Sequence, residues 1–292
     1  MEIFWGLENF KQLENAVVTM GTFDGVHLGH QEIIKDLVQT SKTNQAKSVL
    51  ITFDPHPRKV LQPDIPLQLI QSVEEKNLVL QTTGIDYLII IPFDKQFSEL
   101  SSLEFIQKIL VEKIGCKKLV IGYDHHFGKN REGSFEYLKN NSHLFGFEVK
   151  EISAKKIDET KISSTAIRKY IKDGEIKKAN LLLNYTYFII GKIVDGEKIG
   201  RKIGFPTANI QVDTNKLIHK KSFHHCHPFP FSIDHFCGNV GFYFIYQSIQ
   251  YGLFDKVFSG YYANFACGFR AFEIAYHLHL FHAKIAHGQF GE

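Results

Sequence analysis

The sequence predicts an α/β protein in which a doubly wound parallel sheet is followed by a smaller domain of antiparallel strands. Short apolar runs alternate with longer amphipathic stretches as far as about Tyr185, which is typical of strands alternating with helices. From Tyr185 on, alternating apolar residues and frequent glycines indicate antiparallel strands instead. A chain of 292 residues suits two domains, so we expect them to span residues 1–184 and 185–292.

In the first domain, short apolar runs mark the expected strands, and apolar residues at helical spacing mark the expected helices. The expected strands are Ala16–Met20, Ser48–Phe53, Tyr87–Pro92, Lys118–Ile121 and Phe147–Ile152. The expected helices are Gln31–Thr40, Val73–Thr83, Ser101–Ile114, Ser134–Leu144 and the longer stretch Ser164–Leu183. Ligands of such sheets bind beyond the carboxyl ends of the strands, where the strand order reverses. The loops that follow strands are therefore the first place to look for a site.

Composition narrows the class of protein. Hydrophobic residues make up 44% and charged residues 22%, as in a soluble globular protein, and the net charge of +3 argues against a nucleic-acid surface. The sequence has no apolar stretch of membrane-spanning length and no signal-peptide pattern, so we expect a cytoplasmic protein that does not bind membranes. Composition leaves the oligomeric state open. The irregularly spaced cysteines are expected as reduced thiols: Cys116, Cys226, Cys237 and Cys267.

The segment VVTMGTFDGVHLGH, from Val17 to His30, carries the clearest chemical pattern. An apolar strand leads into a glycine-containing turn and then into a helix. Glycines let the backbone approach a ligand, and the N–H groups and dipole at a helix N-terminus favour an anion. His27 and His30 face the same way near that helix start, so both can donate hydrogen bonds to one phosphate group. The alternative is that they are polar residues beside a tight turn.

Three other segments are expected near the same sheet edge. ITFDPHP carries Asp54 and His56 on a loop stiffened by two prolines, and GYDHHFGKNREG follows the fourth expected strand. KISSTAIR opens a helix with three hydroxyl side chains and Arg168, a bidentate donor suited to phosphate. Each segment has a simpler alternative. ITFDPHP could be a proline-stiffened turn with an exposed histidine, and GYDHHFGKNREG could contain a solvated charge cluster. KISSTAIR could be a plain helix cap with a surface arginine.

In this order the motifs resemble those of bacterial FAD synthetases. GTFDGVHLGH is similar to that family's long form of the HxGH signature of the nucleotidyltransferase superfamily. The other three segments are similar to its FxPHP, GxDFxFG and ISSTxIR motifs, although His125 and His126 stand where the family more often has Phe-Arg. The resemblance implies a nucleotidyltransferase domain that transfers AMP from ATP to FMN, giving FAD and pyrophosphate, with Mg²⁺ on the phosphates.

The resemblance also implies roles for individual residues. His27 and His30 would be catalytic. The residues implied in nucleotide and phosphate binding are Gly21, Phe23, Asp24, Gly29, Ser163, Ser164, Thr165 and Arg168. The residues implied in loops around the flavin or the nucleotide are Asp54, His56, Asp124, Phe127, Gly128 and Arg131.

The string GFPTAN, from Gly204 to Asn209, closely resembles the phosphate-binding motif of riboflavin kinases. Those kinases form a small β-barrel behind the FAD synthetase domain in bifunctional bacterial enzymes. The resemblance implies that Gly204, Thr207 and Asn209 bind phosphate, and that Thr207 and Asn209 hold Mg²⁺ through oxygen ligands. A simple turn at Phe205-Pro206 is the alternative.

The resemblance ends at about Ile218. The following segment holds nine of the chain's 15 histidines and three of its four cysteines but few charged residues. We weigh a diverged barrel against a sequence that is out of register with its family, and favour the second. We therefore expect an incomplete barrel, and its riboflavin kinase activity stays open, with Glu273 as the only candidate base. The His224–His227 cluster matches no standard zinc spacing, so we assign no metal there.

The sequence thus predicts an FMN adenylyltransferase in a bifunctional enzyme of flavin-cofactor synthesis, acting on ATP, FMN and riboflavin. One alternative is a non-catalytic remnant that binds flavin or nucleotide. Another is an adenylyltransferase of the same fold with a different small acceptor, against which the GFPTAN string argues. A third is a chain whose apolar C-terminal segment prevents stable folding.

Overall fold

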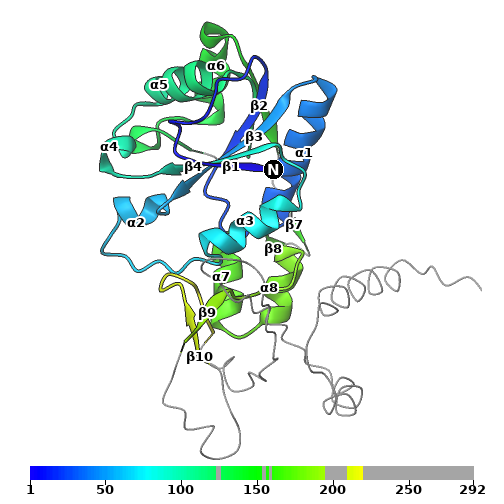
Figure 1. Ribbon diagram of the computed structural model, residues 1–292, viewed down its shortest axis with the longest axis vertical. Helices are drawn as coiled ribbons and strands as arrows, with labels where there is room; N and C mark the ends of the chain where they lie inside the picture. The colour runs from blue at the N-terminus through cyan, green and yellow to red at the C-terminus, as the bar shows by residue number, and fades with distance from the viewer. Residues whose placement is uncertain (123–125, 153–155, 158–159, 195–208, 220–292) are drawn as a thin grey trace, which may run out of the picture. The chain divides into compact units, whose positions relative to one another are not determined.

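The computed structural model of the protein describes residues 1–122, 126–152, 156–157, 160–194 and 209–219 (Figure 1). All of them belong to one compact unit, Met1–Pro228 with Gly241–Gln247. The second unit, Phe229–Val240 with Ser248–Glu292, lies outside the described residues. The expectations for the C-terminal segment, including Glu273 and the His224–His227 cluster, therefore concern residues that the structure does not describe.

A six-stranded sheet forms the centre of the described part (Figure 1). Its strands, in the spatial order β1-β4-β3-β2-β5-β6, all pair in parallel. The chain builds outward from β2 through β3 and β4, then returns to the other side of β2 with β5, so the strand order reverses between β2 and β5. This confirms the predicted doubly wound parallel sheet. The strands are β1 Glu2–Trp5, β2 Ala16–Met20, β3 Lys47–Asp54, β4 Tyr87–Pro92, β5 Cys116–Gly122 and β6 Glu148–Ile152.

Five of these strands correspond to the five that the apolar runs predict, and β2 and β4 have the predicted bounds. The sixth strand, β1, corrects the expectation of five. Among the described strands it pairs only with β4, and both of its end residues are exposed. Its sequence EIFW offers an apolar run of only three residues. A short strand at the edge of a sheet gives a weak sequence signal because only part of it is buried.

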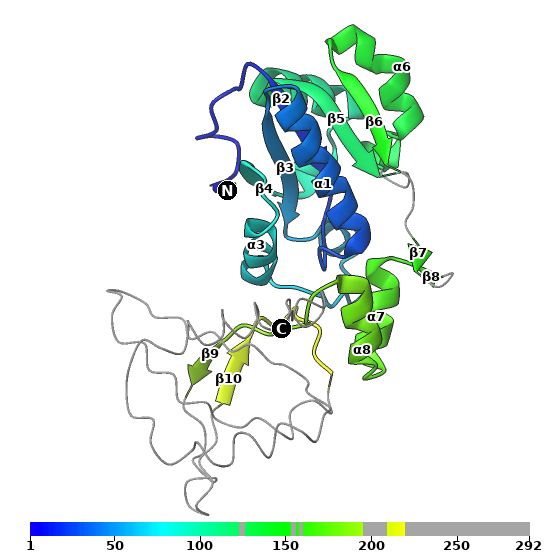
Figure 2. The same cartoon turned by 90° about the vertical axis from the view of Figure 1, so that its right-hand side faces the viewer.

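Helices cover both faces of the sheet (Figures 1 and 2). On one face, α1 (Leu28–Thr43) and α3 (Val73–Gln81) bury Leu37 and Leu80 against the strands. On the other face lie α5 (Ser102–Glu104), the π-helical η1 (Phe105–Ile114) and α6 (Phe135–Phe145), which bury Leu110 and Leu138. Two short helices, α2 (Pro57–Leu61) and α4 (Lys95–Ser98), follow β3 and β4. The expected loop after Asp54 therefore runs into a short helix at its second proline, Pro57.

Beyond the sheet, the expected helix Ser164–Leu183 is two helices. These are α7 (Ser164–Lys172) and α8 (Ile176–Leu183), and the break contains Gly174 at φ +79°. Glycine adopts this left-handed conformation without the steric cost that other residues have. A third hydrophobic cluster joins these helices to Ile70 and Leu217. The small strands β7 (Lys156–Ile157) and β8 (Thr160–Lys161) pair just before α7.

Only a small part of the second expected domain is described. The strands β9 (Gly191–Val194) and β10 (Asn209–Val212) pair antiparallel, as the alternating pattern after Tyr185 predicts. Just after β10, Lys216 forms a parallel bridge with Leu69, in the loop before α3. The complete barrel stays a prediction.

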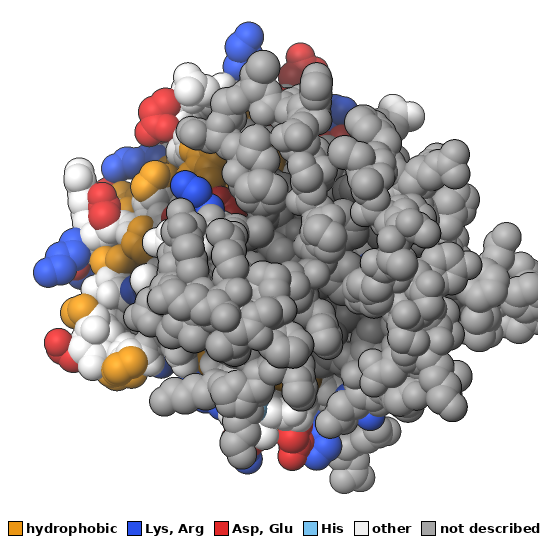
Figure 3. Space-filling model, turned by 60° about the horizontal axis from the view of Figure 1, so that its bottom comes forward, with side chains coloured by type: hydrophobic (Ala, Val, Ile, Leu, Met, Phe, Trp, Pro, Cys, Tyr) orange, Lys and Arg blue, Asp and Glu red, His pale blue; other side chains and the backbone are white. Residues whose placement is uncertain are grey.

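Three further observations concern the surface, the helices and the cysteine of the described part. Where described residues are visible in Figure 3, acidic, basic and hydrophobic side chains are interspersed. None of the described helices has both the length and the apolar character needed to cross a membrane. Within the described ranges Cys116 is the one cysteine, and it is a free thiol buried at the start of β5, where burial raises its pKa.

Candidate active site

The turn between β2 and α1 brings the predicted motif to the point where the strand order reverses. Gly25 has φ +88°, and a Cβ atom built there would lie 2.9 Å from Cδ1 of Ile70. Only glycine fits this left-handed backbone position at such a close approach. The contact fixes the turn against the loop that precedes α3.

His27 and His30 lie together at the N-terminus of α1. His27 is the N-cap residue, and its Nδ1 accepts a hydrogen bond from the backbone N–H of His30 at 3.4 Å. The two imidazole rings stack with centroids 3.6 Å apart and 15° between their planes. A Cβ atom at Gly29 would lie 3.3 Å from the His27 ring, so the absence of a side chain there leaves room for this arrangement.

The surroundings of His30 favour a neutral imidazole. Burial lowers the pKa of His30 well below 6.5, and repulsion from His27, when that ring is protonated, and from Lys76 lowers it further. Because Nδ1 of His27 accepts a hydrogen bond, the ring N–H of His27 lies on Nε2, which can donate. Nδ1 of His30 is buried and has no hydrogen-bond partner among the described residues. The pair therefore offers ring nitrogens at a helix N-terminus that a phosphate can use.

Phe23, expected among the nucleotide-binding residues, is buried in the core. Its ring meets His30 in an edge-to-face contact, with centroids 5.1 Å apart. The structure therefore places Phe23 as a support for the imidazole. Gly21 continues the strand, and its N–H donates to the carbonyl oxygen of Ile51 at 3.0 Å.

Lys76 is a site residue that the sequence did not single out. Its side chain is buried, and Nζ donates to the carbonyl oxygen of Thr22 and to Oγ1 of Thr52, both at 3.1 Å. Burial lowers the pKa of Lys76, while the carboxylates of Asp24 and Asp54 act in the opposite direction. In the sequence this lysine stands in the polar start of a helix, VEEKN, where lysine is normally exposed. No sequence signal distinguished it.

Asp24 connects the turn to α7 and to the loop before α3. Its carboxylate accepts the backbone N–H of Ile70 at 2.9 Å and that of Gln71 at 3.3 Å. It also accepts a hydrogen bond at 2.6 Å from Nη2 of Arg168. Nε of Arg168 donates to the carbonyl oxygen of Gln68. Asp24 and Arg168, both expected to bind nucleotide or phosphate, thus form an ion pair with each other in this structure.

The hydroxyls at the start of α7 are placed in three different ways. The Ser163 side chain caps the helix by accepting the N–H of Ala166 at 3.2 Å. Oγ of Ser164 donates to the carbonyl oxygen of Asp24 at 2.8 Å, which joins the helix to the histidine turn. Thr165 is exposed. Of the three hydroxyls, that of Thr165 is the one presented to solvent.

The segment after β3 reaches the same edge. His56 caps the short helix α2, with Nδ1 accepting the N–H of Arg58 at 3.1 Å. Burial lowers the pKa of His56 to about 4; the charge of Asp24 opposes this shift, and the charges of Arg168 and Lys76 add to it. These electrostatic interactions place His56 near the Asp24–Arg168 pair. Asp54, at the end of β3, contributes a negative charge near Lys76.

The loop expected from GYDHHFGKNREG is only partly described, and its described part packs elsewhere. Phe127 lies against Phe105, with ring centroids 5.5 Å apart, in the core of the opposite sheet face. The next residue, Gly128, approaches Ser102 of α5. Asp124, Gly204 and Thr207 lie outside the described residues, and the side chains of Arg131 and Asn209 are not described. Their expected roles stay predictions.

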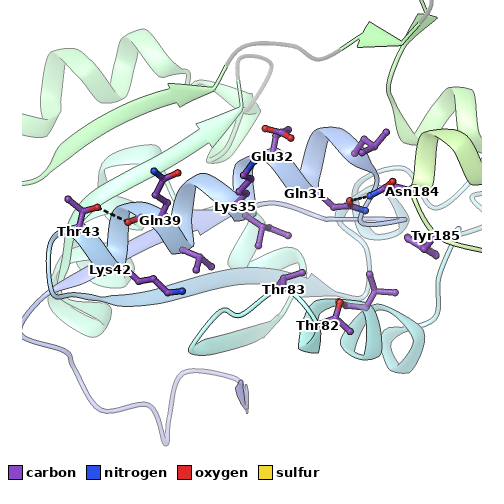
Figure 4. Close-up of a pocket in the computed structure, with 14 residues that line it drawn as sticks. Gln31, Glu32, Lys35, Gln39, Lys42, Thr43, Thr82, Thr83, Asn184 and Tyr185 are labelled. Atoms are coloured by element: carbon purple, nitrogen blue, oxygen red, sulfur yellow. Dashed lines mark hydrogen bonds between the residues drawn. The ribbon is translucent and has the colours of Figure 1, made fainter. Parts of the chain in front are cut away.

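A groove with a volume of about 780 Å³ runs along the outer side of α1 (Figure 4). Gln31, Lys35 and Gln39 line it from α1, and Thr82, Thr83 and Asn184 line its other side. Neither His27 nor His30 is among its lining residues. We therefore assign the site to the histidine turn and not to this groove.

Comparisons with known proteins agree with the motifs. The chain matches the FAD synthetase family over residues 9–166 and the riboflavin kinase family over residues 183–287. The second match extends beyond Ile218, where the resemblance seen in the motifs ends.

Curated relatives match most of the chain. The bifunctional riboflavin kinase/FMN adenylyltransferase of Buchnera aphidicola subsp. Schizaphis graminum is 38% identical over 74% of this chain and 70% of its own length. The proteins of the same name from Listeria monocytogenes and Escherichia coli K12 are 40% and 33% identical, over 70% and 72% of this chain and 65% and 68% of their own lengths.

A solved structure shares the fold. It is that of a Streptococcus pneumoniae protein named a macrolide-efflux protein, with a TM-score of 0.66 and 30% sequence identity. The alignment covers 75% of this chain and 72% of that protein. With the histidine turn at the reversal point of a parallel sheet, and two family matches in the order that the motifs predict, the chain belongs to the family of bifunctional riboflavin kinases/FMN adenylyltransferases.

Proposed function

We propose that the first domain transfers AMP from ATP to the phosphate of FMN, giving FAD and pyrophosphate. The observation that carries this function is the stacked pair His27 and His30 at the N-terminus of α1. The FAD synthetase match over residues 9–166 and the names of the curated relatives support the same reaction. FMN is then a substrate and FAD the product.

The reaction needs charge stabilisation more than proton transfer. An oxygen of the FMN phosphate attacks the α-phosphorus of ATP, and the bond from that phosphorus to the oxygen bridging to the β-phosphate breaks. The nucleophile is already anionic, so positioning and neutralisation of charge provide the catalysis. His27 and His30 donate hydrogen bonds to the phosphate oxygens, beside the positive end of the helix dipole. Lys76 contributes a positive charge from beneath the turn.

Arg168 and the start of α7 complete the phosphate site in this proposal. The ion pair with Asp24 fixes the guanidinium group, and its remaining N–H groups bind the outgoing phosphates. The exposed Thr165 hydroxyl and the free backbone N–H groups of the helix start add further donors. His56 and Asp54 lie at the same edge and border the nucleotide.

Mg²⁺ enters as the MgATP complex. Among the described residues, no group of three His, Cys, Asp or Glu side chains is placed to hold a metal ion. The imidazoles and the lysine around the turn do not suit Mg²⁺, and the carboxylate of Asp24 is engaged by Arg168 and two backbone N–H groups. Phosphate oxygens do suit the ion. The phosphates of ATP therefore supply the main ligands of the ion, which neutralises their charge.

We propose that the second domain binds phosphate through the GFPTAN string, as riboflavin kinases do. The riboflavin kinase match over residues 183–287 supports this assignment. Thr207 and Asn209 would contact the phosphates and their Mg²⁺ there.

The test is to incubate the purified protein with MgATP and FMN and to separate the flavins by chromatography. We expect FAD to form together with an equal amount of pyrophosphate. ATP binding without either product would identify the chain as a nucleotide-binding remnant and overturn the proposal. Acceptance of other small phosphates or acids in preference to FMN would point to a different adenylyltransferase.

A further inference from the structure

Lys216, from the segment after β10, is buried within the first domain. Its Nζ donates to Oε2 of Glu75 at 2.6 Å, to the carbonyl oxygen of Ile70 at 2.7 Å and to that of Phe188 at 2.9 Å. The side chains of Lys216 and Glu75 are each only 1% exposed. All three N–H groups of the ammonium therefore have acceptors, which is the condition under which a buried charge is tolerated.

The neighbouring contacts fix the same segment. The ammonium group lies 4.2 Å from the ring centroid of Tyr187, and the hydroxyl of Tyr187 donates to the carbonyl oxygen of Leu217. The backbone N–H of Leu69 donates to the carbonyl oxygen of Asn215, and the N–H of Leu217 donates to the carbonyl oxygen of Leu69, both at 2.7 Å. Residues 215–217 are thus held against the loop before α3 by backbone and side-chain bonds.

Two chains of contacts lead from Lys216 to the active site. In the first, Lys216 binds the carbonyl of Ile70, while the N–H of Ile70 donates to Asp24, the partner of Arg168. The side chain of Ile70 also packs against Gly25 in the histidine turn.

In the second chain of contacts, Lys216 binds Glu75. The carboxylate of Glu75 also accepts the N–H of Ser72, in the capping box of α3, and the N–H of Ile190. Glu75 directly precedes Lys76, so the first turn of α3 places both residues. Both routes end on groups that surround the phosphate site.

We propose that Lys216 is a positioning residue for adenylyl transfer: a part of the riboflavin kinase segment holds the loop and helix start that orient Asp24, Arg168 and Lys76. This inference rests on the proposed function. It also assigns a role in the first reaction to a residue outside the FAD synthetase match, which ends at residue 166.

The test uses the full chain with Lys216→Met, which keeps the volume but removes the ammonium group. The matched control is Lys169→Met, at an exposed position on α7. FAD formation is measured at a temperature well below thermal unfolding, per folded protein. We expect kcat to fall at least about tenfold in Lys216→Met and to stay unchanged in the control, because small displacements of catalytic groups cost this much or more. An unchanged kcat in folded Lys216→Met would overturn the proposal.

A milder variant decides the question if Lys216→Met does not fold. Tyr187→Phe keeps the buried ion pair and the aromatic ring but removes the hydroxyl that binds Leu217. We expect it to fold and to lower kcat at least about threefold, a smaller loss than for Lys216→Met because the ammonium stays in place. A lowered unfolding temperature with kcat unchanged would show a purely structural role and overturn the proposal.

Hydrogen exchange separates this inference from the proposed function. We expect the amides of Ile70, Gln71 and Lys76 to exchange faster in Lys216→Met than in wild type, relative to the amides of β2. This readout does not depend on activity. If the wild type makes no FAD, the proposed function fails, and the exchange data alone show whether Lys216 holds the loop. Exchange equal to wild type at these amides would overturn the coupling.

Discussion

Oδ2 of Asp24 and Nη2 of Arg168 lie 2.6 Å apart, and their side chains are only 5% and 13% exposed. The pair joins the turn after β2 to a helix that lies 144 residues later in the chain. The same carboxylate receives two backbone N–H groups from the loop before α3. Asp24 is therefore the point at which three separate segments of the site meet.

Replacing Asp24 by asparagine should destabilise the protein. Arg168 would lose its counter-charge while largely shielded from water, and breaking one side of such a pair costs about 3 kcal/mol. Urea unfolding at neutral pH measures the change. The matched control is Asp36→Asn, which breaks a more exposed pair with Lys150 and should cost less than about 1 kcal/mol. Equal losses in the two variants would show that Asp24 has no special structural role.

Replacing His30 by alanine should leave the fold intact and slow FAD formation. Loss of one preorganised donor to the phosphates typically costs about a hundredfold to a thousandfold in rate. Steady-state kinetics with MgATP and FMN, together with circular dichroism, checks both parts. His143→Ala, at an exposed position on α6, is the control and should match wild type. Near-normal turnover of His30→Ala would refute its catalytic assignment.

Replacing Lys76 by methionine tests whether its buried positive charge contributes to catalysis. We expect kcat for FAD formation to fall about a hundredfold, since a fixed positive charge beside the phosphates is lost. The pKa of His56 should rise above its value of about 4, because the charge of Lys76 helps to lower it. Imidazole titration by NMR measures this second effect without any activity. Lys95→Met, at an exposed position, should change neither quantity.

The low pKa of His56 makes stability depend on pH. The folded state keeps this imidazole neutral down to about pH 4, whereas in the unfolded chain it binds a proton near its ordinary value of 6.5. Between these values the unfolded state binds more protons, so stability should fall as the pH falls from about 6.5 to about 4. His30 acts in the same direction.

The variant His56→Asn checks this assignment. Asparagine keeps an acceptor that can cap α2 through the N–H of Arg58 but does not titrate. Urea unfolding across the same pH range should show a smaller loss of stability in the variant than in wild type. Identical curves would mean that His56 does not contribute to the pH dependence.

The choice of flavin substrate, FMN or riboflavin, distinguishes the adenylyltransferase activity of the family from its kinase activity. With FMN and MgATP we expect FAD. With riboflavin and MgATP we expect neither FMN nor FAD, because the sequence after Ile218 has few charged residues and lacks a recognisable acidic strand for the kinase base. Chromatography of both reactions decides the matter. Formation of FAD from riboflavin would show that the C-terminal segment completes a working kinase.

The sheet could be predicted because its central strands are buried on both faces. All five residues of β2 are buried, as are four of the six in β4, and such strands appear as continuous apolar runs. The sequence pattern predicts that helix α1 starts at Gln31, three residues after its observed start at Leu28, because nothing in the sequence shows that His27 itself caps the helix. The break between α7 and α8 depends on one glycine at φ +79°, which a helical pattern spans without interruption.

The site was predictable only where residues form a local motif. His27, His30 and the hydroxyls before Arg168 stand in short segments whose spacing carries chemical meaning. Lys76 and Lys216 do not, because a lysine in a polar segment is normally exposed, and only the fold shows that these two are buried. The pairing of Asp24 with Arg168 is likewise a property of the tertiary structure, since neither residue's neighbours in the sequence indicate the other.

The burial of Lys216 and Leu217 has a consequence for synthesis of the protein. A chain leaves the ribosome from its N-terminus, and domains generally fold as they emerge. Here the loop before α3 receives its last hydrogen bonds from residues 215–217. The adenylyltransferase site therefore reaches its final form only after the first strands of the next domain have left the exit tunnel. A nascent chain that stops before β10 would leave the carboxylate of Glu75 without its lysine partner and would expose the apolar surface that Leu217 covers.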